Sequence, residues 1–504
     1  MAHRETAGLA TEVDGPFGAP VPEETEVATL KAGALNLFDA TAVAVSSTAP
    51  AYSLASALGS LVLISAVGLR APSMIIVSFV PILFIAYAYF HLNRRNPNCG
   101  ASYTWLSEIF HPAVGWFNGF LQIGISVIFC VQAPIVAATY SLSFLQSLGW
   151  LSQASANSTT WTTVLAMGWL VLITSFCVYG IRWATNFQWI LVIIEYVAVV
   201  VFSIGGIIKV ALSATPEKYT SFHASWFNPL GVHGIGTIAT AMAIGTFLFW
   251  GWDTAVNLNE ESKDPSRNPG RAAIISMWLV LGIFVLNFVA AQMLLPRSTL
   301  ENSDDLLFVF GQAFAGKWAS WVMLFAVLSS TVATTQTTLL PSARISYSMA
   351  RDGVFPKLFG SISPKFQTPI KGTLVLAAIS GATIVLVGLD AGASDVISTF
   401  TNNVGAIVAL YYGLTGLACA WAFRKAWREQ WWFTVSGIVL PFLSGIVLLS
   451  IVVFDIAQNG WSGMKWDIIL LVASAVLTPI VWLKKRHRAF FHQATVAYDS
   501  IEGA

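Results

Sequence analysis

The stretch AIISMWLVLGIFVLNFVAAQMLL, residues 273–295, is apolar on every side of a helix and decides the fold class. A bilayer core of roughly 30 Å needs about 20 consecutive apolar residues in helical form. A membrane β-barrel would instead show segments of about ten residues in strict alternation. The stretch therefore predicts a membrane-spanning helix.

The composition of the whole chain extends this prediction. Of 504 residues, 56% are hydrophobic and only 10% are charged, which is too apolar for the surface of a soluble globular protein. The predicted fold class is an all-α integral membrane protein with about 12 transmembrane helices. The predicted spans lie near residues 34–66, 73–92, 112–145, 160–180, 186–211, 232–257, 271–295, 317–343, 371–389, 394–423, 432–455 and 466–483.

Lysine and arginine predict the orientation, because they are retained on the cytoplasmic side of a membrane. With the N-terminus inside, twenty of the 26 fall on inner segments, which also favours an even number of spans. We expect a multi-pass protein of the plasma membrane with both termini cytoplasmic.

Three regions follow along the chain. Residues 1–30 are rich in Asp, Glu, Gly and Pro and lack the pattern of a signal peptide, so they are predicted to be a disordered cytoplasmic tail. Residues 31–485 form one transmembrane transporter domain, and residues 486–504 a cytoplasmic C-terminal tail. The longest polar loop, 342–371, is too short to bury a core of its own.

Motifs for catalysis or metal binding are missing from the sequence. The seven histidines and four cysteines show no HExxH or CxxC spacing, and neither a GxSxG elbow nor a phosphate-binding glycine loop occurs. We expect no enzyme activity, metal, cofactor or nucleic-acid partner. The expected partners are a small-molecule substrate and the lipid bilayer, and the oligomeric state is left open.

Two spans contain helix-breaking features. In AVAVSSTAPAYSLAS (42–56), Pro50 follows small polar residues, and in FLFWGWDTA (247–255), Gly251 lies between two tryptophans. They lie one five-helix unit apart, as expected for equivalent helices of two repeats in a transporter. Taken singly, each residue also fits a simple kink or a close helix contact.

Three motifs resemble the amino acid–polyamine–organocation permeases. They are NPNCGASYTWLSEIFHPAVGWFNGF (96–120), FWGWDTAVNLNEESKDPSRNPGRAA (249–273) and SARISYSMARDGVFPKLF (342–359). The resemblance implies a LeuT-like fold, a five-plus-five inverted repeat followed by two C-terminal helices. It also implies a secondary active transporter that moves amino acids by alternating access.

The resemblance further implies that amides after the first break bind a substrate carboxylate, while carbonyls at the sixth-span break accept its ammonium. Asp253 lies in an apolar stretch, where an ionised acid costs roughly 2.5–3.5 kcal/mol without a cavity or partner, so we expect it to face the substrate route. The candidate binding residues are Ser46, Ser47, Thr48, Ala49, Ala51, Tyr52, Phe247, Phe249, Trp250, Gly251 and Asp253.

One departure leaves the substrate open. Many members of the family have a glycine-rich first break, whereas this chain has no glycine between Gly33 and Gly59. A polyamine or another amine without a carboxylate is therefore an alternative substrate, with Asp253 pairing with its ammonium. A channel with a polar path is a more distant alternative.

Glu195 is an acid within the otherwise apolar fifth span, FQWILVIIEYVAVVVFSIGGII (187–208). Intramembrane acids are candidates for proton coupling, and the resemblance places Glu195 near a lysine that replaces sodium in proton-coupled relatives. The alternatives are a structural acid, or a sodium site formed with hydroxyls of Thr331, Thr334 and Thr335. Such hydroxyls also bond to their own helix, and we favour H⁺ over Na⁺ as the driving ion.

Overall fold

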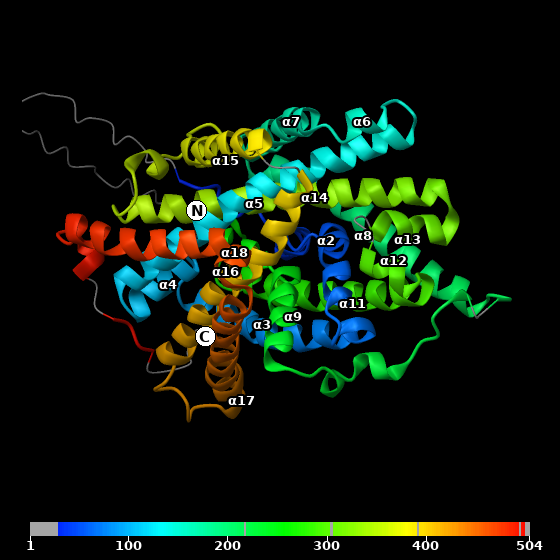
Figure 1. The fold of residues 1–504 in the computed structure, drawn as a ribbon. Coiled ribbons are helices and arrows are strands. Elements are labelled where there is room, and N and C mark those ends of the chain that lie inside the picture. Colours follow the sequence, from blue (N-terminus) through cyan, green and yellow to red (C-terminus); the bar gives the residue numbers. More distant parts are fainter. Residues whose placement is uncertain (1–28, 216–217, 303–305, 391–392, 493–494, 499–504) are drawn as a thin grey trace, which may run out of the picture.

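Apolar helices account for nearly all of the regular structure. The computed structural model describes residues 29–215, 218–302, 306–390, 393–492 and 495–498. Within these residues the long helices lie side by side in one bundle (Figure 1). Among the described residues, one isolated β-bridge occurs, between Leu35 and Ser262. The all-helical prediction is confirmed.

The described residues contain ten helical segments long and apolar enough to cross a membrane. Two interrupted helices complete the twelve predicted spans: α1 (Leu37–Ser47) with α2 (Pro50–Leu63), and α9 (Ile235–Leu248) with α10 (Thr254–Asn257). Helix α18 contains most of one segment, Trp431–Gly460, and all of another, Asp467–Lys485, with non-helical backbone at Gly460 and Met464. The long helices are α3 (Ala71–Arg95), α5 (Pro112–Ser147), α7 (Thr159–Val178), α8 (Ile181–Ala211), α11 (Asn268–Leu294), α14 (Lys317–Arg351), α15 (Ile370–Asp390), α16 (Ala393–Ala422) and α18 (Leu440–Lys485).

Two features of the helices differ from the prediction. Helix α14 continues to Arg351 instead of ending near 343, because its last turns are buried against other helices. The predicted loop 342–371 is correspondingly shorter. The short helices were not predicted, since each is much shorter than a membrane span: α4 (Ser102–Ile109), α6 (Gln153–Ala156), α12 (Arg297–Asn302), α13 (Leu306–Ala315) and α17 (Trp431–Phe433).

Burial separates central helices from peripheral ones. The apolar windows of α5 and α14 are 78% and 72% buried inside the protein, whereas those of α7 and α15 are 33% buried. Large apolar side chains such as Val171 on α7 and Leu386 on α15 are exposed. A membrane would cover these faces, so α7 and α15 are predicted to contact lipid.

One end of the bundle, which we call the basic end, contains Arg95 at the end of α3 and Arg351 at the end of α14. The described part of the C-terminal tail packs there: Phe490 stacks on Tyr103, and the Tyr498 N–H donates to the Ala422 carbonyl at 2.9 Å. The predicted disordered tail, 1–30, lies outside the described residues except for its last two. Residues 493–494 and 499–504 of the predicted C-terminal tail also lie outside them.

Candidate functional site

The first break lies between α1 and α2. The backbone of Ala49 has φ 46°, a left-handed conformation that costs an L-residue roughly 1–2 kcal/mol. Pro50 occupies the first turn of α2, where its missing N–H leaves no helical hydrogen bond unmade. An alanine therefore adopts the conformation that usually favours glycine, and the break forms without one.

The second break, between α9 and α10, faces the first. Gly251 has φ 110°, and a Cβ atom at this position would lie 2.6 Å from the Ser47 carbonyl oxygen. The hydroxyls of Ser47 and Thr254 are hydrogen-bonded at 2.9 Å. Only glycine fits here, for two reasons: its backbone conformation and the close approach of α1.

A small cavity lined by both polar and apolar groups lies where the two breaks meet. Four of the predicted binding residues, Ser47, Trp250, Gly251 and Asp253, line it. The remaining lining residues were not predicted: Gln122, Ile125, Ser126, Thr254, Asn257, Thr338, Pro341, Ile345 and Tyr411.

Asp253 is the one lining residue of this cavity with a formal charge. Its Oδ1 accepts a hydrogen bond from the Tyr412 hydroxyl at 3.0 Å, and its Oδ2 accepts one from the Tyr411 hydroxyl at 3.1 Å. Trp250 Nε1 donates to the Tyr411 hydroxyl at 2.6 Å. A buried carboxylate is stabilised by a positively charged partner, and the described lining contains no Lys, Arg or His that could be this partner.

The other predicted binding residues lie behind the lining. The Phe249 ring packs in the core against Phe79 and Phe284, at centroid distances of 5.6 and 5.3 Å. The Tyr52 ring meets Phe247 edge-on at 6.3 Å. The predicted binding residues that do not line the cavity are Ser46, Thr48, Ala49, Ala51, Tyr52, Phe247 and Phe249.

Glu195 on α8 lies at the first break and is completely buried. Its Oε1 accepts hydrogen bonds from the Ala51 N–H at 2.8 Å and from the Ser330 hydroxyl at 2.7 Å. The Tyr52 N–H donates to the Ser330 oxygen at 3.1 Å. The first amides of α2, which the resemblance assigns to a substrate carboxylate, are thus bonded here to a carboxylate and a hydroxyl of the protein.

The three threonines predicted for ion coupling make different contacts. The hydroxyls of Thr331 and Thr335 donate to carbonyls of their own helix, four residues earlier. The Thr334 hydroxyl instead donates to the Ser47 carbonyl at 2.9 Å and joins α14 to α1. Within the described structure, only Thr334 of the three reaches the first break.

Toward the basic end, the cavity is closed by a cluster that we call the latch: Cys99, Glu260, Glu261, Arg344 and Arg351. Arg344 and Glu261 form a two-pronged ion pair at 2.9 and 3.0 Å, and both side chains are fully buried. In the sequence, Glu261 lies in a segment of mixed charge, residues 259–267. Its complete burial shows that this side chain is not part of a solvated loop.

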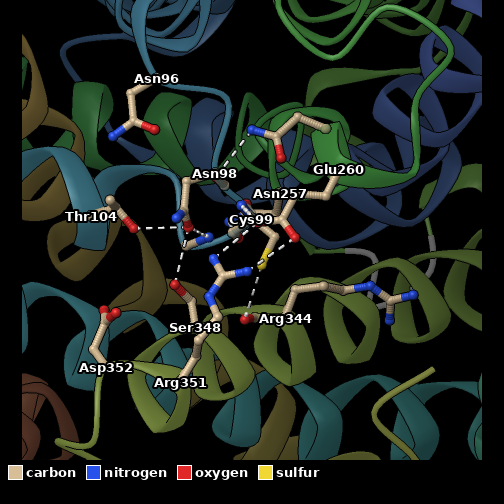
Figure 2. Close-up of polar contacts among 12 residues, drawn as sticks. Asn96, Asn98, Cys99, Thr104, Asn257, Glu260, Arg344, Ser348, Arg351 and Asp352 are labelled. Atoms are coloured by element: carbon tan, nitrogen blue, oxygen red, sulfur yellow. Dashed lines mark hydrogen bonds and ion pairs between the residues drawn. The ribbon is translucent and has the colours of Figure 1, made fainter. Parts of the chain in front are cut away.

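The outer layer of the latch joins three segments (Figure 2). Glu260 accepts a hydrogen bond from the Cys99 N–H at 2.9 Å and pairs with Arg351 at 3.0 Å. Asn257, which lines the cavity, donates to the Cys99 carbonyl at 3.2 Å. The latch is thus in direct contact with the lining of the cavity, on the side of the basic end.

The pKa of the Glu260 carboxyl lies below its ordinary value. Burial acts to raise this pKa, but the hydrogen bonds from Arg351 and from the Cys99 N–H lower it by more. Ionised Glu260 therefore stabilises the closed latch, and this contribution is lost as the pH falls through the lowered pKa.

Besides the other unpredicted lining residues, sequence reasoning missed the Asp253 partners Tyr411 and Tyr412 and the Arg344–Glu261 pair. The adjacent tyrosines in an apolar span are a signal that could have been noticed. An arginine seven residues before the end of a long helix gives no such signal, because its burial depends on packing between distant segments.

Residues 35–481 match the family model of the amino acid permeases. The human large neutral amino acids transporter small subunit 2 is 29% identical over 69% of this chain and 62% of its own length. The mouse Asc-type amino acid transporter 1 is 29% identical over 65% of this chain and 58% of its own length.

A third relative is named for a different substrate. The low-affinity putrescine importer PlaP of Escherichia coli K12 is 26% identical over 70% of this chain and 74% of its own length. The alignments thus span about three fifths of the length of the first two relatives. Because the family model covers most of the chain, the protein belongs to the amino acid permease family.

Proposed function

We propose that the protein is a secondary active transporter that carries an amino acid across the plasma membrane by alternating access, with both termini in the cytoplasm. The observation that carries this proposal is the cavity beside Asp253 at the meeting point of two helix breaks, next to the closed latch. Broken helices near the midplane supply backbone groups to a substrate. Opening of the latch would expose the cavity at the basic end.

Counterflow in proteoliposomes tests the carrier mechanism. A carrier gives saturable uptake of labelled substrate that is accelerated by unlabelled substrate inside the vesicles. Flux that stays linear in substrate concentration, together with electrical conductance, would instead identify a channel.

A carboxylate-free amine is a second candidate substrate, and two observations favour it. The Ala51 and Tyr52 amides are already bonded to Glu195 and Ser330, so a substrate carboxylate would have to displace these partners. The charged group in the cavity lining is an acid, Asp253. The relatives include both amino acid transporters and a putrescine importer.

Asp253→Asn separates the two substrate classes. Loss of a charged hydrogen bond costs about 1.5–3 kcal/mol, so we expect the KM of an amine that pairs with Asp253 to rise by roughly 10- to 150-fold. The measurement is the concentration dependence of putrescine and leucine uptake. Tyr412→Phe keeps the charge and removes one donor, so its effect should be smaller. The KM of leucine should change less, because the resemblance assigns its ammonium to backbone carbonyls. An unchanged KM of putrescine in Asp253→Asn would contradict this pairing.

We further propose that a proton drives uptake through Glu195. Its support is the position of this buried acid at the first break, where protonation changes a carboxylate that bonds α2 to α8. A pH gradient of about one unit supplies about 1.4 kcal/mol, enough for roughly tenfold accumulation with one proton per substrate.

Glu195→Gln should abolish accumulation driven by a pH gradient, while counterflow continues. Glutamine keeps an acceptor for Ala51 and Ser330 but carries no exchangeable acidic proton. The measurement compares uptake by both proteins under an imposed pH gradient and an imposed sodium gradient. Undiminished pH-driven uptake in the variant would end the proposal, and sodium-driven uptake by the wild type would point to a sodium site.

A further inference from the structure

A polar seam extends from Glu195 toward the basic end, between α8, α14 and α1. It consists of Gln188 and Glu195 on α8, Ser330 and Gln336 on α14, and Ser46 on α1. All five side chains are at most 1% exposed. The three helices contact one another here, so these side chains are not exposed at the surface of the protein.

Hydrogen bonds order the seam along two antiparallel helices. Gln336 Nε2 donates to the Ala184 carbonyl at 2.8 Å. One turn farther from the basic end along α8, Gln188 Nε2 donates to the Ala333 carbonyl at 3.3 Å and to the Ser46 hydroxyl. Still farther from the basic end, the Glu195 carboxylate accepts a hydrogen bond from the Ser330 hydroxyl. The rise from Ala184 to Glu195 is about 17 Å at about 1.5 Å per residue, roughly half of the hydrocarbon core.

Three acceptors in this seam have no hydrogen-bond donor among the described residues: Gln188 Oε1, Gln336 Oε1 and Glu195 Oε2. Buried acceptors are almost always satisfied by protein or by ordered water. Three unpaired acceptors in one polar seam therefore indicate that hydrogen-bond donors from outside the protein bind there. Water is the donor available in a membrane protein.

The charged groups around Glu195 do not offer another partner. The titratable neighbour is Tyr196, whose hydroxyl donates to the Val45 carbonyl at 3.5 Å. On the packed helices, Asp39 of α1 bonds to Trp189, and Arg344 of α14 is paired with Glu261. Among the described residues, no basic side chain forms an ion pair with Glu195 within 4.0 Å.

We propose that bound water in this seam conducts the coupling proton between Glu195 and the basic end, with the Gln188 and Gln336 carbonyls as its fixed acceptors. This inference rests on the proposed proton coupling. On release, the O–H bond of the Glu195 carboxyl breaks, and the proton forms a new O–H bond on the adjacent water. The electron pair stays on the carboxylate, whose charge is stabilised by the Ala51 N–H and the Ser330 hydroxyl.

The test follows hydrogen exchange at Glu195 in the whole transporter. In proteoliposomes transferred to D₂O, the infrared carboxyl band that is lost in Glu195→Gln reports this group. Gln188→Leu and Gln336→Leu should each slow its exchange, and pH-driven uptake, by at least about tenfold, which corresponds to 1.36 kcal/mol of barrier. Counterflow without a pH gradient should stay near the wild-type rate. Gln188→Asn should restore part of the exchange, because it keeps an amide acceptor.

Gln292→Leu is the matched control. Gln292 is a fully buried glutamine of α11 outside the seam, so its replacement removes the same groups and should leave both rates unchanged. Wild-type exchange and uptake in both seam variants would overturn the proton route even if Glu195→Gln confirms coupling. Retained pH-driven uptake in Glu195→Gln would overturn coupling itself. If either seam variant fails to fold, the other tests the same route from the opposite helix.

Discussion

Gly251→Leu should abolish transport while the protein still inserts into the membrane. The Cβ atom of a side chain at this position would lie only 2.6 Å from the Ser47 carbonyl oxygen. The backbone φ of 110° is also one that L-residues rarely adopt. Backbone strain of this kind costs about 1–3 kcal/mol, and the steric clash adds to it. A total of about 3 kcal/mol reduces the population of the transport-competent junction by roughly 100-fold.

The measurement is initial uptake at equal amounts of reconstituted protein. Gly282→Leu is the control, because Gly282 lies in α11 with no atom within 4 Å of an added Cβ. It should transport at close to the wild-type rate. Wild-type uptake by Gly251→Leu would show that the meeting point of the two breaks is not the substrate site.

Glu261→Gln should open the latch and destabilise the protein. It leaves the fully buried Arg344 without its counter-charge, and removing one partner of a buried ion pair costs about 3–5 kcal/mol. Cys99 reports the opening, because it is buried within the latch and its N–H bonds to Glu260. We expect its labelling by a maleimide to accelerate at least about tenfold, since 1.4 kcal/mol of that cost already shifts an equilibrium tenfold.

Two controls make this result specific. Cys99→Ser identifies the labelled site among the four buried cysteines. Glu301→Gln removes the acid of an exposed ion pair with Arg297 on α12, where such pairs contribute about 0.2–1 kcal/mol, so labelling should not change. Equal labelling of wild type and Glu261→Gln would mean that the buried pair does not hold the latch closed.

The fold was predictable because membrane spans are local in sequence. The run 273–295 falls in α11 except for its last residue, and the break at Pro50 separates α1 from α2, as the proline chemistry required. The end of α14 was predicted eight residues too early, since its last turns are buried by other helices and not by lipid. Hydrophobicity cannot distinguish these two environments at a helix end.

The candidate site was predictable only where the sequence contains residue types that are unusual in a membrane span. Gly251 and Asp253 were found because a glycine and an acid are unusual in an apolar span. The distances from Asp253 to Tyr411 and Tyr412, from Glu261 to Arg344 and from Gln188 to Ser46 connect residues more than eighty positions apart. Pairing at such separation is set by helix packing, for which one sequence contains no direct signal.

The bridge between Leu35 and Ser262 joins the segment before α1 to the segment after α10. The Leu35 N–H donates to the Glu261 carbonyl at 3.0 Å, and the Lys263 N–H donates to the Leu35 carbonyl at 2.7 Å. The segment before α1 and the segment after α10 must therefore move together. Spin labels at the exposed positions Lys31 and Lys263 should keep a constant separation and act as a ruler. A label pair at Lys263 and Lys357, across to the segment after α14, should lengthen with each opening and provide the signal of a conformational sensor.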